Sequence, residues 1–413
     1  MFKFGYGLAY TILNAQFLAF IGIVITSRSF QKHQNTYIPY LILYIIYFFF
    51  DSVIQSISFL TKWNEYKMPI ILIMWATMLL DDIKKGSVSV LKLRRSFITI
   101  IIFEIVLGGL QYMITPIGNF FRNVQYVRYG ELTEIPDVLE TGYMVGTLGG
   151  SSTYANFIAS SFIILILYYF NRVKMEIKNW ILLASMIASI LFSGIRSPFL
   201  IIIIVGVIAI IKYQRHLVRP LCIVCASLFI IKGGIQLGAI DNLRRVGFEE
   251  GGLFRTFTLF SFNTNSLVEE STIALTICMI PYMLANPLIG IGLHHKGGYV
   301  LEMWNETLET FSTTDAQLAF MIAEIGIIGV IVYLLPFYNY IKEVKKLHFA
   351  TFNYNLYFAS LIIMTIVDSG IMDTFQLLLF FYSVVFWVDP LPIEWNKNNK
   401  YKGQSAIKSV YSQ

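Results

Sequence analysis

A few charged side chains beside apolar segments are the residues of this sequence that could do chemistry. Arg196 stands between Gly194 and Pro198 in "LFSGIRSPFLIIIIVG", and Asp315 opens the stretch "DAQLAFMIAEIGIIG". A guanidinium group is planar and permanently charged, so it can bind a diphosphate through paired hydrogen bonds. A carboxylate can accept the proton of an incoming hydroxyl group. These two residues therefore predict a diphosphate-binding position with a proton acceptor near it.

Three further arginines, two histidines and two glycines are candidates for the same site. They are Arg244, Arg245, Arg255, Gly290, Gly292, His294 and His295, in "DNLRRVGFEEGGLFRTFTL" and "ANPLIGIGLHHKGGYV". The arginines would supply a second clamp on the diphosphate, and one histidine would be a polar contact. Because no strand precedes the G-x-G, it predicts a tight turn beside a closely approaching group, not a nucleotide site. Adjacent histidines do not share a helix face, so no metal site is expected, and no cofactor.

Each of the two leading candidates also has a structural explanation. An arginine at membrane depth costs about 2.5–3.5 kcal/mol on insertion, and Arg196 could instead extend its charge to the interface as an anchor. Asp315, or Thr314 before it, could cap the N-terminus of the helix that follows. The sequence leaves both explanations open.

Membrane-spanning helices are the elements that must position these side chains. Of the 413 residues, 56% are hydrophobic and 14% are charged, and the mean hydropathy is +0.65. A soluble protein of this size needs more charged surface, whereas apolar runs of about 17–25 residues suit a bilayer. Without an alternating strand pattern these spans are helices. The sequence predicts an all-α polytopic membrane protein with about 11 (10–12) transmembrane helices, near 5–26, 37–60, 66–81, 96–117, 153–170, 178–194, 198–212, 217–235, 315–339, 354–372 and 374–389.

The basic residues indicate which ends of these helices face the cytoplasm. One set of connections, together with the C-terminal tail, holds 20 of the 31 lysines and arginines. The positive-inside rule makes that set cytoplasmic, with the N-terminus outside and the C-terminus inside. The long loops 118–152 and 236–314 are then extracytoplasmic. Residues 1–393 form a single membrane domain and 394–413 a polar cytoplasmic tail. The run "STIALTICMIPYML" is too short to span and is expected to be an interfacial or re-entrant helix.

Four stretches resemble, in order, the Wzy-type O-antigen and capsular polysaccharide polymerases, within the superfamily that includes the O-antigen ligases. "GTLGGSSTYANFIASSF" resembles the family's G-T-x-G-x-x-N-x-x-A segment, and "SGIRSPFLIIIIVG" its S-G-x-R helix start. "ANPLIGIGLHH" resembles the P-x-x-G-x-G of the large loop, and "TDAQLAFMIAEIGIIG" the helix after it. Asp315 precedes Gly326 by eleven residues, the place of the ligases' histidine. An acid there favours a polymerase.

The resemblance implies a GT-C-like fold and a metal-independent glycosyltransferase in the bacterial cytoplasmic membrane, with its active site facing outside. The donor would be a growing O-antigen, capsule or exopolysaccharide chain on undecaprenyl diphosphate. The acceptor would be a lipid-linked repeat unit whose hydroxyl, assisted by Asp315, attacks the anomeric carbon with inversion. Arg196 and a second arginine would offset the charge of the leaving diphosphate. A flippase and a chain-length regulator are the implied protein partners, and nucleic acid is not a partner.

Two other functions are alternatives. An O-antigen-type ligase, which transfers finished glycan to a lipid or cell-wall acceptor, has the same fold and donor, and only the acid at position 315 argues against it. A transporter of lipid-linked oligosaccharide would be expected to have internal repeats and charged residues inside its spans. The sequence has no such repeat, and Asp51 and Glu104 are the only charges that it places well inside the spans.

Overall fold

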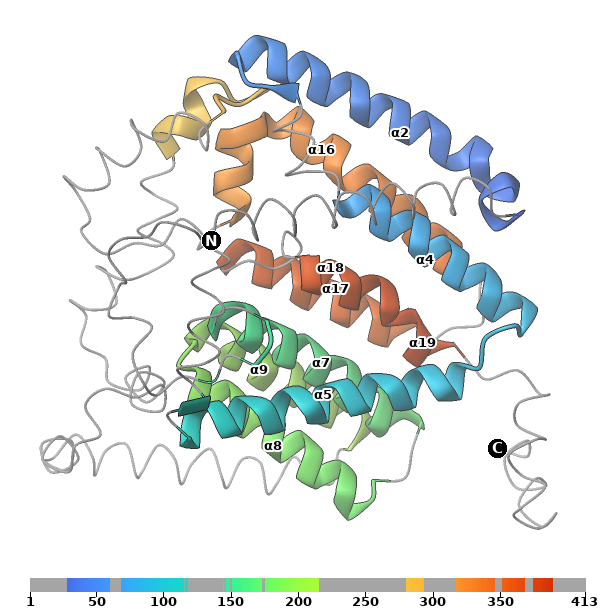
Figure 1. Ribbon diagram of the computed structural model, residues 1–413, viewed down its shortest axis with the longest axis vertical. Helices are drawn as coiled ribbons and strands as arrows, with labels where there is room; N and C mark the ends of the chain where they lie inside the picture. The colour runs from blue at the N-terminus through green and yellow to red at the C-terminus, as the bar shows by residue number, and fades with distance from the viewer. Residues whose placement is uncertain are drawn as a thin grey trace, which may run out of the picture.

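The computed structural model of the chain describes residues 28–59, 68–114, 116–117, 144, 146–148, 151–172, 175–214, 280–292, 317–345, 351–367 and 374–388. These residues form helices and their connections, with no strand among them. In chain order the helices are α2 (Arg28–Gln55), α4 (Met68–Lys85), α5 (Val90–Met113), α7 (Ser151–Arg172), α8 (Ile177–Ser193), α9 (Arg196–Tyr213), α16 (Gln317–Lys345), α17 (Thr351–Val367), α18 (Thr374–Tyr382) and α19 (Val384–Trp387). Figure 1 shows most of them running along a common direction, whereas the first part of α16 turns away from it.

Each predicted span coincides with a described helix, except those at 5–26 and 217–235. The last predicted span falls on α18 and α19 together. Among the described residues, three helices are long and apolar enough to cross a bilayer, at Val90–Met113, Ser152–Asn171 and Leu318–Val344, and shorter apolar helices accompany them. The described part is therefore that of an all-α membrane protein. The two remaining spans, the tail and the first part of "STIALTICMIPYML" lie outside the described residues, while 280–285 are helical.

Several predicted helix ends are wrong. α2 begins at Arg28, well ahead of residue 37, and continues through Pro39, and α16 extends to Lys345. Hydropathy locates the apolar middle of a helix, whereas the polar turns beyond it give no such signal. α5 begins at Val90 because the hydroxyl of Ser89 accepts a hydrogen bond from the backbone N–H of Lys92, which caps the helix before its apolar part starts.

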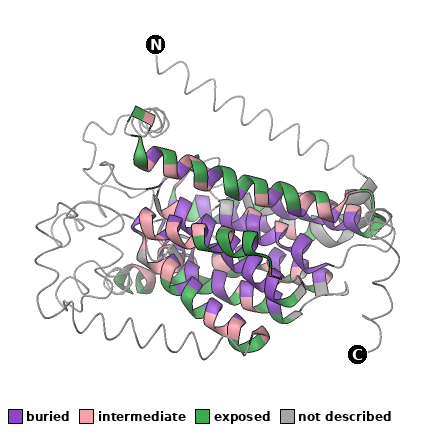
Figure 2. Cartoon of the chain, turned by 90° about the horizontal axis from the view of Figure 1, so that it is seen from below, coloured by how far each residue is buried: buried purple, intermediate pink, exposed green. Residues whose placement is uncertain are grey.

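The helices form a central layer with a group on each side. α17 and α18 lie between α5, α7, α8 and α9 on one side and α2, α4 and α16 on the other (Figure 1). Aromatic rings join α16 to α18: Tyr340 meets Phe381 edge-on at 4.9 Å between centroids, and Phe337 stacks on Phe381 at 5.4 Å. In Figure 2 the buried residues occupy the helix faces that point into the bundle, and the exposed ones occupy the outward faces. The outward residues on these faces are mostly apolar, as helices surrounded by lipid require.

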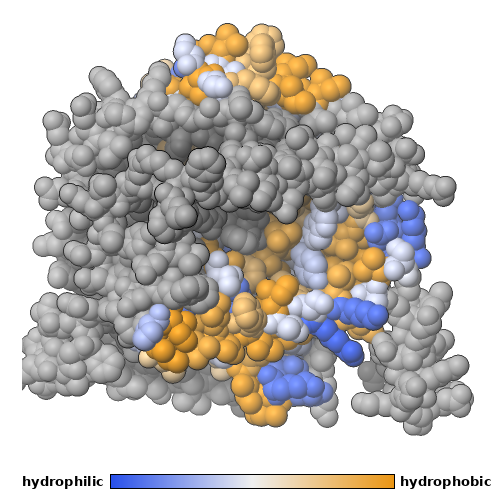
Figure 3. All heavy atoms as spheres, viewed as in Figure 1, coloured by the Kyte–Doolittle hydropathy of each residue, from blue (hydrophilic) through white to orange (hydrophobic). Residues whose placement is uncertain are grey.

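The two ends of the bundle differ in charge. One end, which we call the basic end, holds Lys84 and Lys85 at the end of α4, Lys178 in the first turn of α8 and Lys212 at the end of α9. The other, which we call the loop end, is where α2, α5 and α8 finish and α7, α9 and α16 begin. The loop end lies to the left in Figure 1. Figure 3 shows hydrophilic residues toward the right and apolar residues between the ends.

Arg94 lies inside the bundle near the basic end, although hydropathy assigns it to a cytoplasmic connection. Its Nε and Nη2 donate to the carbonyls of Val385 and Val388 at 2.8 and 2.6 Å. Its Nη1 donates to the hydroxyl of Tyr168 at 3.1 Å, and the guanidinium carbon lies 4.8 Å from the centroid of that ring. Because a buried charge needs such partners, Arg94 ties the end of α19 to α5.

Candidate functional site

The α8–α9 connection at the loop end is as short as the sequence predicts. α8 ends at Ser193, Gly194 adopts a left-handed conformation with φ 74° and ψ 5°, and α9 begins at Arg196. The hydroxyl of Ser193 donates to the carbonyl of Ile190 at 2.6 Å and accepts from the N–H of Ile195 at 3.5 Å. This turn places Arg196 in the first turn of α9. The side chain of Arg196 is outside the described part of the structure.

A short segment before α7 is fixed to α5 beside this turn. The side-chain amide of Gln111 exchanges two hydrogen bonds with the backbone of Gly146, both at 2.8 Å. The carboxylate of Glu104 accepts the backbone N–H of Thr147 at 2.9 Å and also accepts the hydroxyl of Thr147. Gln111 and Glu104 lie two helical turns apart on one face of α5, so the segment is held at two points.

The same segment contacts the end of α8. The N–H of Met144 donates to the carbonyl of Phe192 at 3.3 Å, and the rings of Tyr112 and Phe192 are 4.9 Å apart. A Cβ on Gly146, which has φ +61°, would lie 2.2 Å from the Glu104 carboxylate, so glycine is required there. The end of α5, residues 144 and 146–148, and the end of α8 therefore form one connected unit.

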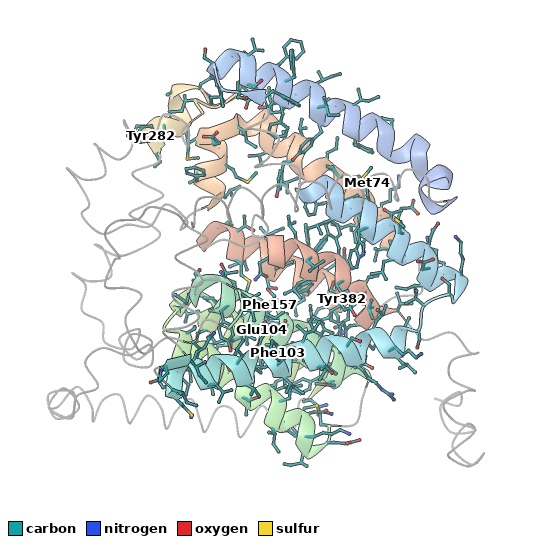
Figure 4. All side chains as sticks on the ribbon, viewed as in Figure 1. Met74, Phe103, Glu104, Phe157, Tyr282 and Tyr382 are labelled. Carbon is teal, nitrogen blue, oxygen red and sulfur yellow. The ribbon has the colours of Figure 1, made fainter. Side chains whose placement is uncertain are left out.

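Glu104 has a clear structural role that the sequence did not indicate. Its side chain is buried in α5, and Figure 4 labels it on that helix. A carboxylate within a span is costly unless donors surround it, and Thr147 supplies two donors. Gly146 and Thr147 are the "GT" of the polymerase-like segment. The sequence shows an acid inside one predicted span and a Gly-Thr pair before a later span. Nothing in the sequence indicates that the two are in contact.

The second part of the loop end is a break in α16. Gly326 has φ 68° and ψ 175°, which interrupts the helix. The backbone N–H groups of Ile327 and Ile328 thereby lose their partners one turn earlier. They donate instead to the carbonyls of Pro287 and Leu288, at 2.9 and 3.1 Å. The loop 286–292 thus replaces the helical acceptors that the break removes.

The carbonyls freed by the break are also satisfied by this loop. The N–H of Ile291 donates to the carbonyl of Ala323 at 2.8 Å, and that of Gly292 donates to the carbonyl of Glu324 at 3.2 Å. Gly290 has φ +80°, and a Cβ on it would lie 2.5 Å from the carbonyl oxygen of Glu324. The predicted tight turn with a close approach is confirmed, and the approaching group is the backbone of α16. A contact of Gly290 or Gly292 with a substrate stays a prediction.

The structure places only some of the predicted site residues. Gly290, Gly292 and the backbone of Arg196 are described, and all three lie at the loop end. Asp315 precedes the first residue of α16, Gln317, by two positions. Asp315 itself lies outside the described residues, together with Arg244, Arg245, Arg255, His294 and His295. The start of α9 and the start of α16 are thus brought to the same end, whereas the remaining side chains are not placed.

The prediction that Asp51 and Glu104 are the only charges well inside the spans is wrong. Glu324 belongs to the predicted span 315–339 and is fully buried within α16. A single acid in the run "AFMIAEIGIIG" hardly lowers the hydropathy of its window, so the run still reads as an apolar span. Among the described residues, no three His, Cys, Asp or Glu side chains are grouped so that they could hold a metal ion.

Comparisons with known proteins identify no relative of the chain, since no protein-family model, curated protein or solved structure matches it.

Proposed function

We propose that this protein is a polysaccharide polymerase that joins undecaprenyl-diphosphate-linked repeat units by inverting glycosyl transfer at the outer face of the bacterial cytoplasmic membrane. One observation carries the proposal. Arg196, in the first turn of α9, and the start of α16, two residues after Asp315, lie at the same end of the bundle. These two positions belong to the "SGIR" and "TDAQ" stretches that resemble the polymerases.

The charge distribution supports an outward-facing site. The helix ends opposite the loop end hold Lys84, Lys85, Lys178 and Lys212. Lysine-rich ends are retained on the cytoplasmic side during insertion. The loop end then faces outward, where a lipid-linked repeat unit would meet a growing chain.

The proposed reaction uses the charges of the loop end. The hydroxyl oxygen of the acceptor sugar forms a bond to the anomeric carbon of the donor, while Asp315 takes the hydroxyl proton. The bond from that carbon to the diphosphate oxygen breaks, and the electron pair leaves with undecaprenyl diphosphate. Arg196 and one of Arg244, Arg245 or Arg255 stabilise the negative charge that develops on the leaving group.

The hydrogen bonds around the loop end support this use of Arg196. A catalytic group must be held by elements whose own contacts are fixed. The α8–α9 turn has its glycine in the left-handed conformation, and its neighbour, the 144–148 segment, is bonded to Glu104 and Gln111. The end of α8, which leads through this turn into α9, is therefore held from the α5 side at Phe192.

Deleting the gene and analysing the surface glycan tests the proposal. The proposed polymerase predicts loss of long polymer together with survival of a product that carries a single repeat unit. A ligase would give undecaprenyl-linked polymer that is not transferred, and a flippase would leave lipid-linked single units on the cytoplasmic side. Either of the last two results would contradict the proposal.

A transporter of lipid-linked oligosaccharide is the second candidate, because α16 is discontinuous. Transporters commonly bind substrate where a membrane helix is broken, and α16 is broken at Gly326 beside buried Glu324. Reconstituted vesicles separate the two functions. A polymerase forms new glycosidic bonds when donor and acceptor lie in the outward-facing leaflet, whereas a transporter moves the donor between leaflets and makes no bond.

A further inference from the structure

We infer that α2 supplies two positioning residues, Tyr47 and Gln55, which fix the direction of the N-terminal arm of α16 (residues 317–325) and thereby the place of Asp315. The role given to Asp315 rests on the proposed function. The contacts that hold the arm do not, because they are bonds among described residues of α2, the loop 286–292 and α16.

Tyr47 contacts α16 on both sides of the break. The hydroxyl of Tyr47 donates to the carbonyl of Ile325, which precedes Gly326. A Cβ on Gly329 would lie 2.7 Å from this hydroxyl oxygen, so the glycine gives Tyr47 its access. One phenol group thus joins the two sides of the break.

Gln55 holds the arm and the loop together. Its Nε2 donates to the carbonyl of Glu324 at 2.9 Å and lies 3.3 Å from the carbonyl of Ile289. The same nitrogen lies 2.8 Å from a carboxylate oxygen of Asp51, one turn earlier on α2. Asp51 and Gln55 are both buried. The carboxylate therefore orients the amide, and the amide contacts the arm just before Gly326.

These bonds favour the observed direction of the arm because a straight α16 would satisfy its own backbone. Continuing the helix through Gly326 would restore the internal bonds of Ile327 and Ile328, which the broken form replaces with bonds to Pro287 and Leu288. The backbone of α16 is therefore satisfied in either form, so groups outside α16 that bond only to the broken form shift the population toward it. The loop 286–292 supplies such groups, and so do Tyr47 and Gln55.

The test removes each group and follows a buried position on the arm. Ala319 is buried, so Ala319→Cys, in a protein whose Cys222, Cys225 and Cys278 are serine, reports exposure of the arm through its rate of reaction with a maleimide. Tyr47→Phe and Gln55→Leu are made in this protein. Tyr340→Phe is the matched control, since the hydroxyl of Tyr340 donates to the carbonyl of Phe381 at 3.0 Å nearer the other end of α16. The kcat and KM for polymerisation of lipid-linked repeats are measured in parallel.

Tyr47→Phe should raise the labelling rate about tenfold, as loss of one buried hydrogen bond allows. Gln55→Leu should do the same, and Tyr340→Phe should leave the rate unchanged. Both α2 variants should lower kcat while KM stays near the wild-type value, because the substrate site remains and only the base moves. Equal labelling in all four proteins would overturn the inference. If the wild-type protein forms no polymer, the proposed function fails, and the labelling rates still decide whether α2 holds the arm.

Discussion

Gly290 shows how a single residue supports the loop end. It has φ +80°. A Cβ on this residue would lie 2.5 Å from the carbonyl oxygen of Glu324 and 2.6 Å from the backbone nitrogen of Gly326. The sequence predicted a tight turn with a close neighbour here, because two glycines follow a proline at short spacing. It could not identify the neighbour, since the contact depends on a break in a helix that reads as one continuous apolar run.

Gly290→Ala should therefore destabilise the protein. A left-handed conformation costs a residue other than glycine about 1–3 kcal/mol, and the clash with α16 adds to this. Gly109→Ala is the control, because a Cβ at Gly109 would have only one neighbour, at 3.9 Å, and alanine favours a helix by about 0.5–1 kcal/mol over glycine. Thermal unfolding in detergent should show a lower Tm for Gly290→Ala only. Equal Tm values for both variants would contradict the close approach.

The helices were largely predictable because long apolar runs favour helices, which satisfy their own backbone hydrogen bonds in a bilayer. The α8–α9 turn was predictable too, since Gly194 and Pro198 frame it with almost no connecting residues. The break in α16 was not predictable. Gly326 stands among isoleucines, as a glycine in an ordinary transmembrane helix does. The groups that bond to the backbone around the break come from α2 and the loop 286–292. Gln55 of α2, for example, lies 269 positions away in the sequence from Glu324, whose carbonyl it contacts.

Arg196, at the start of α9, should be needed as a guanidinium and not only as a charge. Arg196→Lys keeps the charge but loses the planar pair of donors that fits a diphosphate. We expect both Arg196→Lys and Arg196→Ala to reduce polymer strongly at normal protein abundance, measured by gel analysis of surface glycan. Arg95→Lys, on an exposed position of α5 near the basic end, is the control and should have no effect. Near-normal polymer from Arg196→Ala would make Arg196 an interfacial anchor.

At the scale of the whole molecule, the proposed reaction requires that the loop end face outward and the basic end face the cytoplasm. Glu250→Cys, in the long second loop, should react with a membrane-impermeant maleimide in intact cells, or in spheroplasts where an outer membrane blocks the reagent. Lys345→Cys, at the end of α16, should react only after the membrane is permeabilised. Both variants are made with the three native cysteines replaced by serine. Labelling of Lys345→Cys with protection of Glu250→Cys would invert the orientation.

The central claim is that the loop end catalyses polymerisation with Asp315 as the proton acceptor. The decisive measurement is the polymerisation rate of lipid-linked repeats by purified wild-type and Asp315→Asn proteins. Asparagine keeps the size of the side chain and can still cap a helix, but it cannot take a proton. General-base assistance is worth about 10²–10⁴ in rate, so Asp315→Asn should insert normally, bind lipid-linked substrate and lose most polymerisation. A rate within about threefold of wild type, far short of that loss, would contradict the claim and leave Asp315 as a helix cap.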